Sequence, residues 1–248
     1  MPAVKRRRTK QQVKEGKMAN AKFYGAGFPY KKIKKLPGKL IVVEGTDGVG
    51  RSTQVDILKK HLEKHGFAVS DTGLRRSPLT ERGLEQAKSG NTLNAITNSL
   101  FYATDFADRL ENQIIPALRA GFIVLSDRYF YSIIARDVIR GIDPQWAREI
   151  YGFALVPDII IYLKAEIDTL ITRIVHGRGF DFWEAGMDII KATNLYDSFR
   201  EYQGRMIEQF DKMAKEFHFQ IIDANGSIKT TNDLIMEKLN PILEEYNQ

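Results

Sequence analysis

Five short apolar runs, rich in β-branched residues, recur along the chain from residue 39 onward. They are KLIVVE (39–44), FAVSD (67–71), GFIVLSD (121–127), PDIIIYL (157–163) and HFQIID (218–223). Short apolar runs bounded by glycine or polar residues are typical of strands that are buried on both faces of a sheet. We therefore predict five strands.

Helical periodicity fills the intervals between these runs. Val55, Leu58 and Leu62 share one face of a helix that we predict over about residues 52–65. Further helices are predicted over about 92–119, 145–155, 188–217 and 231–246. Pro116 is expected to kink or close the last turn of the 92–119 helix. Strands that alternate with helices indicate an α/β fold with a parallel five-stranded sheet and helices on both faces.

The pattern shows no internal repeat and no second core. We therefore predict one α/β domain over residues 39–248, preceded by an N-terminal extension of residues 1–38. In open parallel sheets, ligands bind beyond the carboxyl ends of the strands. Three polar stretches fall at such ends: Gly45–Thr53, Asp127–Ser132 and the turn after Asp71.

Charge is distributed unevenly between these two parts. The net charge of the chain is +6, but residues 1–39 contain 13 Lys and Arg residues and one acid, Glu15, for a net +12. The remaining 209 residues carry 24 bases and 30 acids, for a net −6. The extension fits three interpretations: a solvated flexible tail, a contact for nucleic acid or another polyanion, or a segment docked on the body through the aromatic residues of KFYGAGFPY.

Composition excludes several classes of site. The chain contains no cysteine, so it has no disulfide, thiolate metal site or cysteine nucleophile. Its four histidines show no spacing that suits a metal, and none is assigned a catalytic role. No apolar run approaches the roughly 20 residues of a membrane span, and no secretory leader is recognisable. We expect a cytoplasmic protein without a membrane partner.

A glycine-rich turn after the first predicted strand has the pattern of a phosphate-binding loop. Its residues, all candidate ATP contacts, are Gly45, Thr46, Asp47, Gly48, Val49, Gly50, Arg51, Ser52 and Thr53. Glycines let backbone N–H groups face a phosphate, and the following helix adds its positive N-terminus. The Ser52 hydroxyl suits Mg²⁺. Arg51 stands where the pattern has lysine, so the charge is kept on a broader, planar group. We expect phosphate binding to survive, with an altered turnover.

Four further stretches join this loop in a resemblance to a known family. They are RRSPLTERG (75–83), LFYATDFADRLENQIIPALRAG (100–121), VLSDRYFYSIIA (124–135) and PDIIIYL (157–163). Together with IVVEGTDGVGRST (41–53), they resemble thymidylate kinases, P-loop nucleoside monophosphate kinases that phosphorylate dTMP with ATP. The resemblance runs from about residue 39 to the C-terminus. It implies a P-loop NTPase-type sheet, MgATP as donor and a homodimer, although nothing in the composition indicates a dimer.

The resemblance also implies roles for individual residues. Asp47 is placed like the family's carboxylate that faces the acceptor's sugar hydroxyl, and Asp127 would orient Mg²⁺ together with Ser52. Arg128 resembles the arginine that grips the acceptor phosphate, and Arg76 the one that assists it. The remaining implied contacts are Tyr102, which would stack on the base, Tyr131, which would line the deoxyribose, and Arg178, which would close over the transferred phosphate. Phosphoryl transfer depends mainly on positioning and charge neutralisation, so such a site needs no nucleophilic side chain.

Several positions depart from the family pattern. Phe106 stands where the family has a base-reading arginine, and Arg109, one helical turn on, is a candidate to replace it. Arg136 and Asp137 replace a Tyr-Gln pair. In the lid segment, RIVHGRGFDFWEAGMD (173–188), Phe182 follows the aspartate where an arginine is usual. Because the first two changes fall on base recognition, they bear on the choice of acceptor.

The residues leave three hypotheses open. The chain is a kinase that makes dTDP from dTMP and ATP, or it is a kinase of a different nucleoside monophosphate. The third hypothesis is a nucleotide-binding protein that Arg51 has weakened catalytically and whose basic tail binds nucleic acid.

Overall fold

The computed structural model describes residues 20–89 and 94–246. Its five strands form one parallel sheet in the order β2-β3-β1-β4-β5. The strands are β1 (Lys39–Gly45), β2 (Val69–Gly73), β3 (Ile123–Asp127), β4 (Ile159–Lys164) and β5 (Gln220–Asp223). Each lies within or overlaps one of the five apolar runs, so the predicted α/β class and parallel sheet are confirmed.

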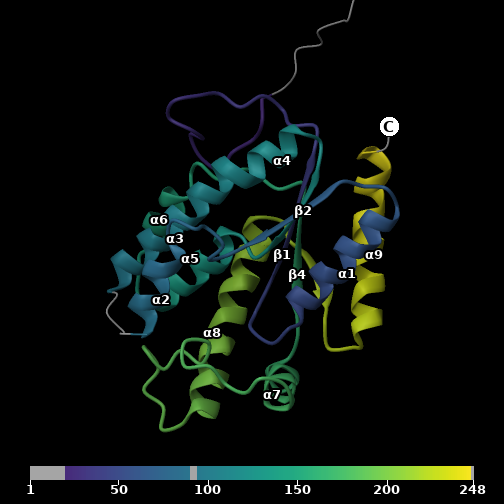
Figure 1. Ribbon diagram of the computed structural model, residues 1–248. Helices are drawn as coiled ribbons and strands as arrows, with labels where there is room; N and C mark the ends of the chain where they lie inside the picture. The colour runs from purple at the N-terminus through teal and green to yellow at the C-terminus, as the bar shows by residue number, and fades with distance from the viewer. Residues whose placement is uncertain (1–19, 90–93, 247–248) are drawn as a thin grey trace, which may run out of the picture.

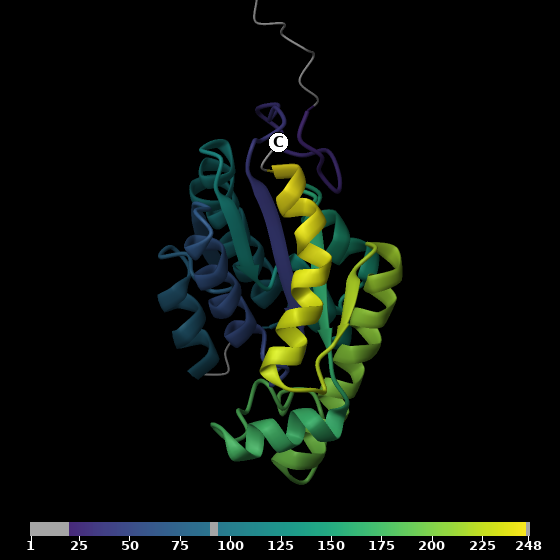
Figure 2. The ribbon, with the colours of Figure 1, turned by 90° about the vertical axis from the view of Figure 1, so that its right-hand side faces the viewer.

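Helices cover both faces of the sheet (Figures 1 and 2). On one face lie α1 (Arg51–Lys64) and α9 (Ile228–Tyr246), and on the other lie α3 (Ala95–Arg109), α5 (Phe130–Ile139) and α8 (Leu195–Glu216). Side chains of β1 alternate between the two cores: Ile41 and Val43 pack toward α1 and α9, whereas Leu40 and Val42 pack toward α3 and α5. The remaining helices are α2 (Glu81–Ser89), α6 (Pro144–Ile150) and α7 (Ile167–His176).

The helix predicted over 92–119 is divided into three parts. After α3 comes a π-helical turn, Leu110–Ile114, and then α4 (Ile115–Arg119), while residues 92 and 93 lie outside the described residues. Pro116 has no N–H to donate to the preceding turn, and a π-helical turn accommodates the missing bond. The helix predicted from residue 188 begins later, at Leu195, where the Asn194 side chain accepts from the Asp197 N–H.

Residues 20–38 pack against the body of the protein. Tyr24 N–H donates to the Ala154 carbonyl oxygen at 3.1 Å, and the Tyr24 ring contacts Phe130 and Phe217 edge-on. The Tyr24 hydroxyl hydrogen-bonds to the buried hydroxyl of Tyr131 on α5. We call residues 20–38 the arm.

The Tyr24–Tyr131 hydrogen bond gives a test of how firmly the arm is joined to α5. Tyr24→Phe is expected to lower the free energy of unfolding by about 1–2 kcal/mol, because it leaves the buried Tyr131 hydroxyl without that partner. Adding Tyr131→Phe should recover most of this loss. Urea unfolding of both single variants and the double variant measures the coupling. If the losses in free energy of unfolding of the two single variants simply added in the double variant, this would contradict a coupling between Tyr24 and Tyr131.

A second buried contact joins α3 to α5. The Ser99 hydroxyl donates to an Asp137 carboxylate oxygen at 2.5 Å, and both residues are buried. Burial raises the pKa of Asp137 from its ordinary 3.8 to about 6, although Ser99, Arg140 and Arg136 act in the opposite direction. The folded state therefore holds this proton more tightly than the unfolded state, so the associated stability is present below about pH 4 and is lost as the pH rises through about 6.

Asp137→Asn should remove this pH dependence. At pH 3.5 the variant and the parent are expected to melt at similar temperatures, whereas at pH 7.5 the variant should melt about 3–6 °C higher, since an ionised buried carboxylate costs on the order of 1–3 kcal/mol. Thermal melts across this pH range provide the measurement. Asp233→Asn, at an exposed position on α9, is the control. The difference between its melting temperature and that of the parent should not change with pH. If the difference in melting temperature between Asp137→Asn and the parent stayed constant with pH, this would argue against the raised pKa of Asp137.

Candidate active site

The glycine-rich turn forms a closed loop between β1 and α1. Gly45, Gly48 and Gly50 have φ values of +147°, +81° and +95°, which side-chain-bearing residues rarely adopt. A Cβ on Gly45 would also lie 2.6 Å from the Leu163 carbonyl oxygen. The loop ends at Arg51, the first residue of α1, so the positive end of that helix faces the loop. This backbone geometry is suited to holding phosphate groups.

The guanidinium of Arg51 lies against the loop and is 9% exposed. Its Nη1 donates to the carbonyl oxygens of Gly45 and Thr46. Its Nε donates to a carboxylate oxygen of Asp127, at the end of β3, at 3.0 Å. Arg51 therefore places a positive charge inside the phosphate loop and also ties the loop to the neighbouring strand.

Ser52 and Asp127 form an oxygen pair beside this loop. The Ser52 hydroxyl donates to the second Asp127 oxygen at 2.6 Å. Burial acts to raise the pKa of Asp127, but Arg51, Ser52 and Arg128 outweigh it and keep that pKa below its ordinary value. A hydroxyl beside an ionised carboxylate is a donor set that Mg²⁺ accepts, so the two residues predicted for the metal lie together and fit it.

Asp47 is the carboxylate on which three arginines converge. Arg128 donates to one of its oxygens and Arg136 to the other, the latter at 3.3 Å, and Arg51 Nη2 lies 3.9 Å away. Gln203 on α8 accepts from the Asp47 backbone N–H at 3.3 Å. Burial works against the charge, yet the arginines prevail and hold the pKa of Asp47 far below its usual range. Asp47 is therefore ionised at every working pH.

Arg128 owes its position to an unusual backbone conformation. Its φ is +73°, and the following turn is held by the buried Glu44, whose carboxylate accepts from the Tyr129 N–H at 2.7 Å and the Ser132 hydroxyl at 2.6 Å. Burial and the neighbouring Arg51 lower the pKa of Arg128 to about 10, against the opposing effect of Asp47. The side chain is thus a buried cation that faces the phosphate loop.

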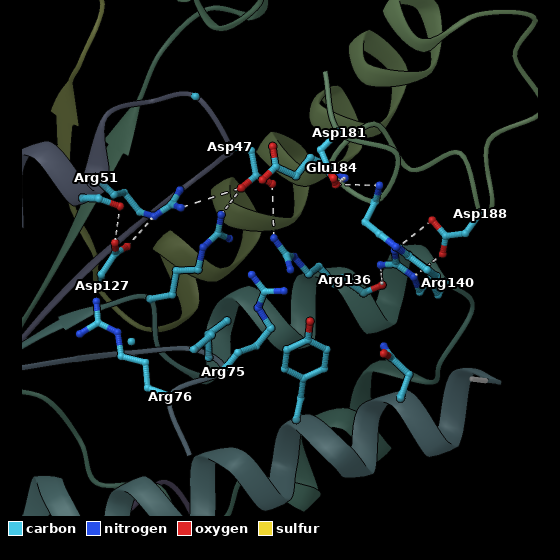
Figure 3. A pocket seen from close by; sticks show the side chains of 18 of the residues that line it. Asp47, Arg51, Arg75, Arg76, Asp127, Arg136, Arg140, Asp181, Glu184 and Asp188 are labelled. Carbon is cyan, nitrogen blue, oxygen red and sulfur yellow. Dashed lines mark hydrogen bonds and ion pairs between the residues drawn. The ribbon is translucent and has the colours of Figure 1, made fainter. Parts of the chain in front are cut away.

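The loop after β2 is held in a similar way. Buried Asp105 on α3 accepts from the backbone N–H of Arg75 at 3.1 Å and of Ser77 at 2.9 Å. The Arg76 side chain is 48% exposed and donates to Asp71 at 2.8 Å. Figure 3 shows Arg76 on the side of Asp127, whereas Arg75 reaches toward the middle of the group.

One cavity of about 780 Å³ connects these groups. Its lining includes the predicted residues Asp47, Gly48, Gly50, Arg51, Ser52, Thr53, Arg76, Tyr102, Asp127, Arg128 and Arg178. The cavity is of the size that holds a small ligand or cofactor. Arg178 lies on the lid segment, is 60% exposed and pairs with Glu184. The structure therefore brings residues from both ends of the predicted site to one space.

Three predicted substrate contacts lie elsewhere. Phe106, Arg109 and Tyr131 are all fully buried, and none lines the cavity formed by the described residues. Phe106 packs on the Tyr129 ring, Arg109 pairs with Asp105 at 2.9 Å, and Tyr131 bonds to the arm. Phe106 and Arg109 lie beyond Tyr102 on α3, where the helix is buried in the core, and Tyr131 lies on α5 beneath the arm. Through Asp105, Arg109 supports the loop after β2.

Other lining residues were not predicted as contacts. Arg136 lies in the last turn of α5, and Arg140 directly follows the helix and binds Asp188 in the lid segment through two hydrogen bonds of 2.9 and 3.2 Å. Arg75 and Asn98 complete the wall near Tyr102. The spacing of Arg136 and Arg140 was visible in the sequence, but only the fold shows that both face the cavity.

Two kinds of feature are absent from the described residues. Within residues 20–89 and 94–246, no cluster of three or more His, Cys, Asp or Glu side chains could hold a metal ion. None of the helices in the same ranges is long and apolar enough to cross a membrane.

Comparisons with known proteins agree with this geometry. A family model described as thymidylate kinase matches residues 43–235. Among curated relatives, "Probable thymidylate kinase 2" of Saccharolobus solfataricus is 38% identical over 213 residues, which cover 85% of this chain and 98% of the relative. "Probable thymidylate kinase" proteins of Thermococcus gammatolerans and Thermococcus kodakarensis are 34% and 32% identical, over 77% and 83% of this chain and 91% and 98% of their own lengths. The chain belongs to the thymidylate kinase family.

Proposed function

We propose that the protein transfers the γ-phosphoryl group of ATP to the 5′-phosphate of dTMP, giving ADP and dTDP. The observation that carries this proposal is the continuity of one cavity, which is bordered by the phosphate loop and by Arg128, Asp47 and Tyr102. Family membership supports dTMP as the acceptor, so a different nucleoside monophosphate and a purely nucleotide-binding role are less well supported.

The donor side consists of the loop and the start of α1. Backbone N–H groups of the loop and the helix N-terminus hold the ATP phosphates, and Arg51 adds charge beside them. Ser52 and Asp127 would hold Mg²⁺, which, when bound, neutralises charge on the donor phosphates. Arg178, exposed on the lid segment, would close over the transferred group.

The acceptor side begins at Arg128 and ends at Tyr102. Arg128 and Arg76 bind the monophosphate of the acceptor from two walls, and ionised Asp47 accepts a hydrogen bond from the sugar hydroxyl. Tyr102 stacks on the base, with Asn98 one helical turn away on the same face of α3. Arg136 and Arg140 line the same wall and take the place of the arginine absent at position 106.

The chemistry follows from charge. The attacking atom is an oxygen of the acceptor phosphate, which is already anionic, so no side chain needs to remove a proton from it. Attacking and leaving oxygens repel each other, and the arginines between them offset this repulsion. Because Arg128 and Arg51 are fixed before substrate binds, little reorganisation is needed during transfer.

Three further expectations stay predictions. They are a cytoplasmic location, a homodimer, and the division into an extension of residues 1–38 and a kinase domain of residues 39–248. Contact between the extension and a polyanion also stays a prediction. The other proposed partners are ATP and dTMP.

A panel of acceptors tests the proposed reaction. With MgATP as donor, dTMP should give dTDP and ADP in equal amounts, with a higher kcat/KM than dUMP, dCMP, dAMP, dGMP or UMP. Coupled ADP assays and chromatography of the products provide the measurement. ADP formation that no monophosphate raises above the background hydrolysis of ATP would exclude kinase activity. A different preferred acceptor would retain the kinase and reject dTMP.

Substitutions at position 51 test the cation of the loop. Arg51→Met should lower kcat/KM for ATP by about 10²–10³-fold, the effect of removing one charge-stabilising donor from a transition state. Arg51→Lys keeps the charge and should remain within about tenfold of the parent. Arg119→Met, at an exposed position on α4, is the matched control and should be neutral. Full activity of Arg51→Met would show that the loop acts without this side chain.

A further inference from the structure

The arm, residues 20–38, is an ordered addition outside the family match of residues 43–235. Backbone hydrogen bonds join it to the segment before β4: Gly25 N–H donates to the Gly152 carbonyl oxygen at 2.9 Å, and Val156 N–H donates to that of Lys22 at 2.9 Å. The approach is close, since a Cβ on Gly25 would lie 2.8 Å from the Gly152 Cα. The first part of the arm is therefore fixed to the body, Ala21 N–H donates to the Ile33 carbonyl oxygen at 3.0 Å, and Gly38 N–H donates to that of Leu118 at 2.8 Å.

In the docked arm, apolar side chains pack on the body and basic side chains are exposed to solvent. Ile33 is buried, and Phe23 and Tyr24 pack on the core. The arm contains no acid, and all five of its lysines are exposed: Lys22, Lys31, Lys32, Lys34 and Lys35. Among the described residues, none of these lysines forms an ion pair with a carboxylate. An unneutralised charge of +5 on a fixed surface attracts polyanions.

Three acids beside the arm form no ion pair with its lysines. Lys39 lies 3.4 Å from Asp158 and 3.5 Å from Glu245, whereas Glu111 accepts a hydrogen bond from the Tyr30 hydroxyl. A neutral hydroxyl does not cancel the charge of a carboxylate, so Glu111 offsets part of the positive charge beside Tyr30, and the five lysines still leave the arm basic.

An aromatic pair lies among these lysines. Tyr30 is 62% exposed and stacks on Phe28, with ring centroids 5.6 Å apart and planes inclined by 26°. The Lys31 ammonium lies 5.0 Å from the Tyr30 centroid and 5.3 Å from that of Phe28. Exposed aromatic rings flanked by basic side chains bind unpaired bases by stacking and their phosphates by charge. An anionic lipid surface would use the lysines but has no bases to stack on Tyr30.

The location of the arm separates it from the catalytic cavity. Figures 1 and 2 show the arm (purple) at the end of the molecule where β1 begins, whereas the phosphate loop follows the opposite end of β1. A polymer bound to the arm therefore leaves the cavity open. We propose that the arm binds single-stranded nucleic acid, with Lys31, Lys32, Lys34 and Lys35 contacting phosphates and Tyr30 stacking on a base.

Matched charge variants of the full chain test this proposal. The arm variant replaces Lys31, Lys32, Lys34 and Lys35 by Gln. The control variant makes the same change at exposed lysines of α1 and α8: Lys60, Lys64, Lys212 and Lys215. Both variants lower the net charge from +6 to +2, so a difference between them reports position and not total charge. The probe is a fluorescent single-stranded DNA of about 20 nucleotides, longer than the 4–16 nucleotides that single-strand sites commonly cover.

The arm variant should bind this probe at least tenfold more weakly than the parent, whereas the control should change less than about threefold. The slope of log K against log salt should fall in magnitude by about 3 in the arm variant, because each phosphate that a lysine no longer neutralises lowers it by about 0.7. Tyr30→Ala should weaken binding about tenfold, as loss of one stacked base does. Turnover of ATP with dTMP should be unchanged in all three variants.

Several results would overturn the proposal. These are equal losses in the arm and control variants, no binding by the parent, or binding that excess ADP abolishes, which would place the probe in the cavity. Equal affinity for a duplex of the same length, with Tyr30→Ala neutral, would reject the single-strand assignment. Tighter binding of the arm to anionic phospholipid vesicles than to the probe would assign the surface to membranes. None of these outcomes depends on the kinase reaction, so failure here leaves that reaction untouched.

Discussion

The arrangement of the active site depends on one buried carboxylate, Asp47. Seven arginines border the cavity of the described residues: Arg51, Arg75, Arg76, Arg128, Arg136, Arg140 and Arg178. Cations that lie so close together in a poorly solvated space repel one another; burial, and after it repulsion by Arg51 and Arg136, lowers the pKa of Arg128. Asp47 offsets this repulsion because Arg128 and Arg136 bind its two oxygens and Arg51 lies close by. Asp47 thereby holds these arginines together at the cavity, the arrangement that the proposed binding of phosphate groups requires.

Two other buried acids keep the arginine-bearing loops in place. Glu44, next to the last residue of β1, binds the turn after β3, which carries Arg128, and Asp105 on α3 binds the turn after β2, which carries Arg75. Burial raises the pKa of Glu44, and the hydrogen bonds from Ser132 and Tyr129 act in the opposite direction. In both cases an acid from one element fixes the backbone of another. The fold therefore fixes the backbone from which the Arg128 and Arg75 side chains reach the cavity.

The sequence was sufficient for the sheet and for the phosphate loop, because buried strands and glycine turns are encoded locally. It did not single out α5, whose first six residues, Phe130 to Ala135, are all buried and leave no polar face to mark a helical period. Helical spacing correctly linked Arg109 to Phe106, but it could not tell a stripe facing the cavity from one facing the core. The pairing of Arg136 with Asp47 joins residues 89 positions apart and appears only when α5 packs beside β1. The departure from the family pattern thus drew attention to Arg136 in the sequence, whereas its partner, Asp47, could be recognised only in the folded structure.

The arginine at position 51 is consistent with this network of shared charges. A lysine ammonium is a single centre, so a lysine that turned to a phosphate would release its other partners. The Arg51 guanidinium has three nitrogens. Its Nη1 binds the loop carbonyls and its Nε binds Asp127, whereas Nη2 lies 3.9 Å from Asp47, within the group that lines the cavity. One guanidinium can therefore keep the loop joined to β3 and still present an N–H group to a bound phosphate. The proposed role of Arg51 in phosphate binding is thus compatible with its structural tie between the loop and β3.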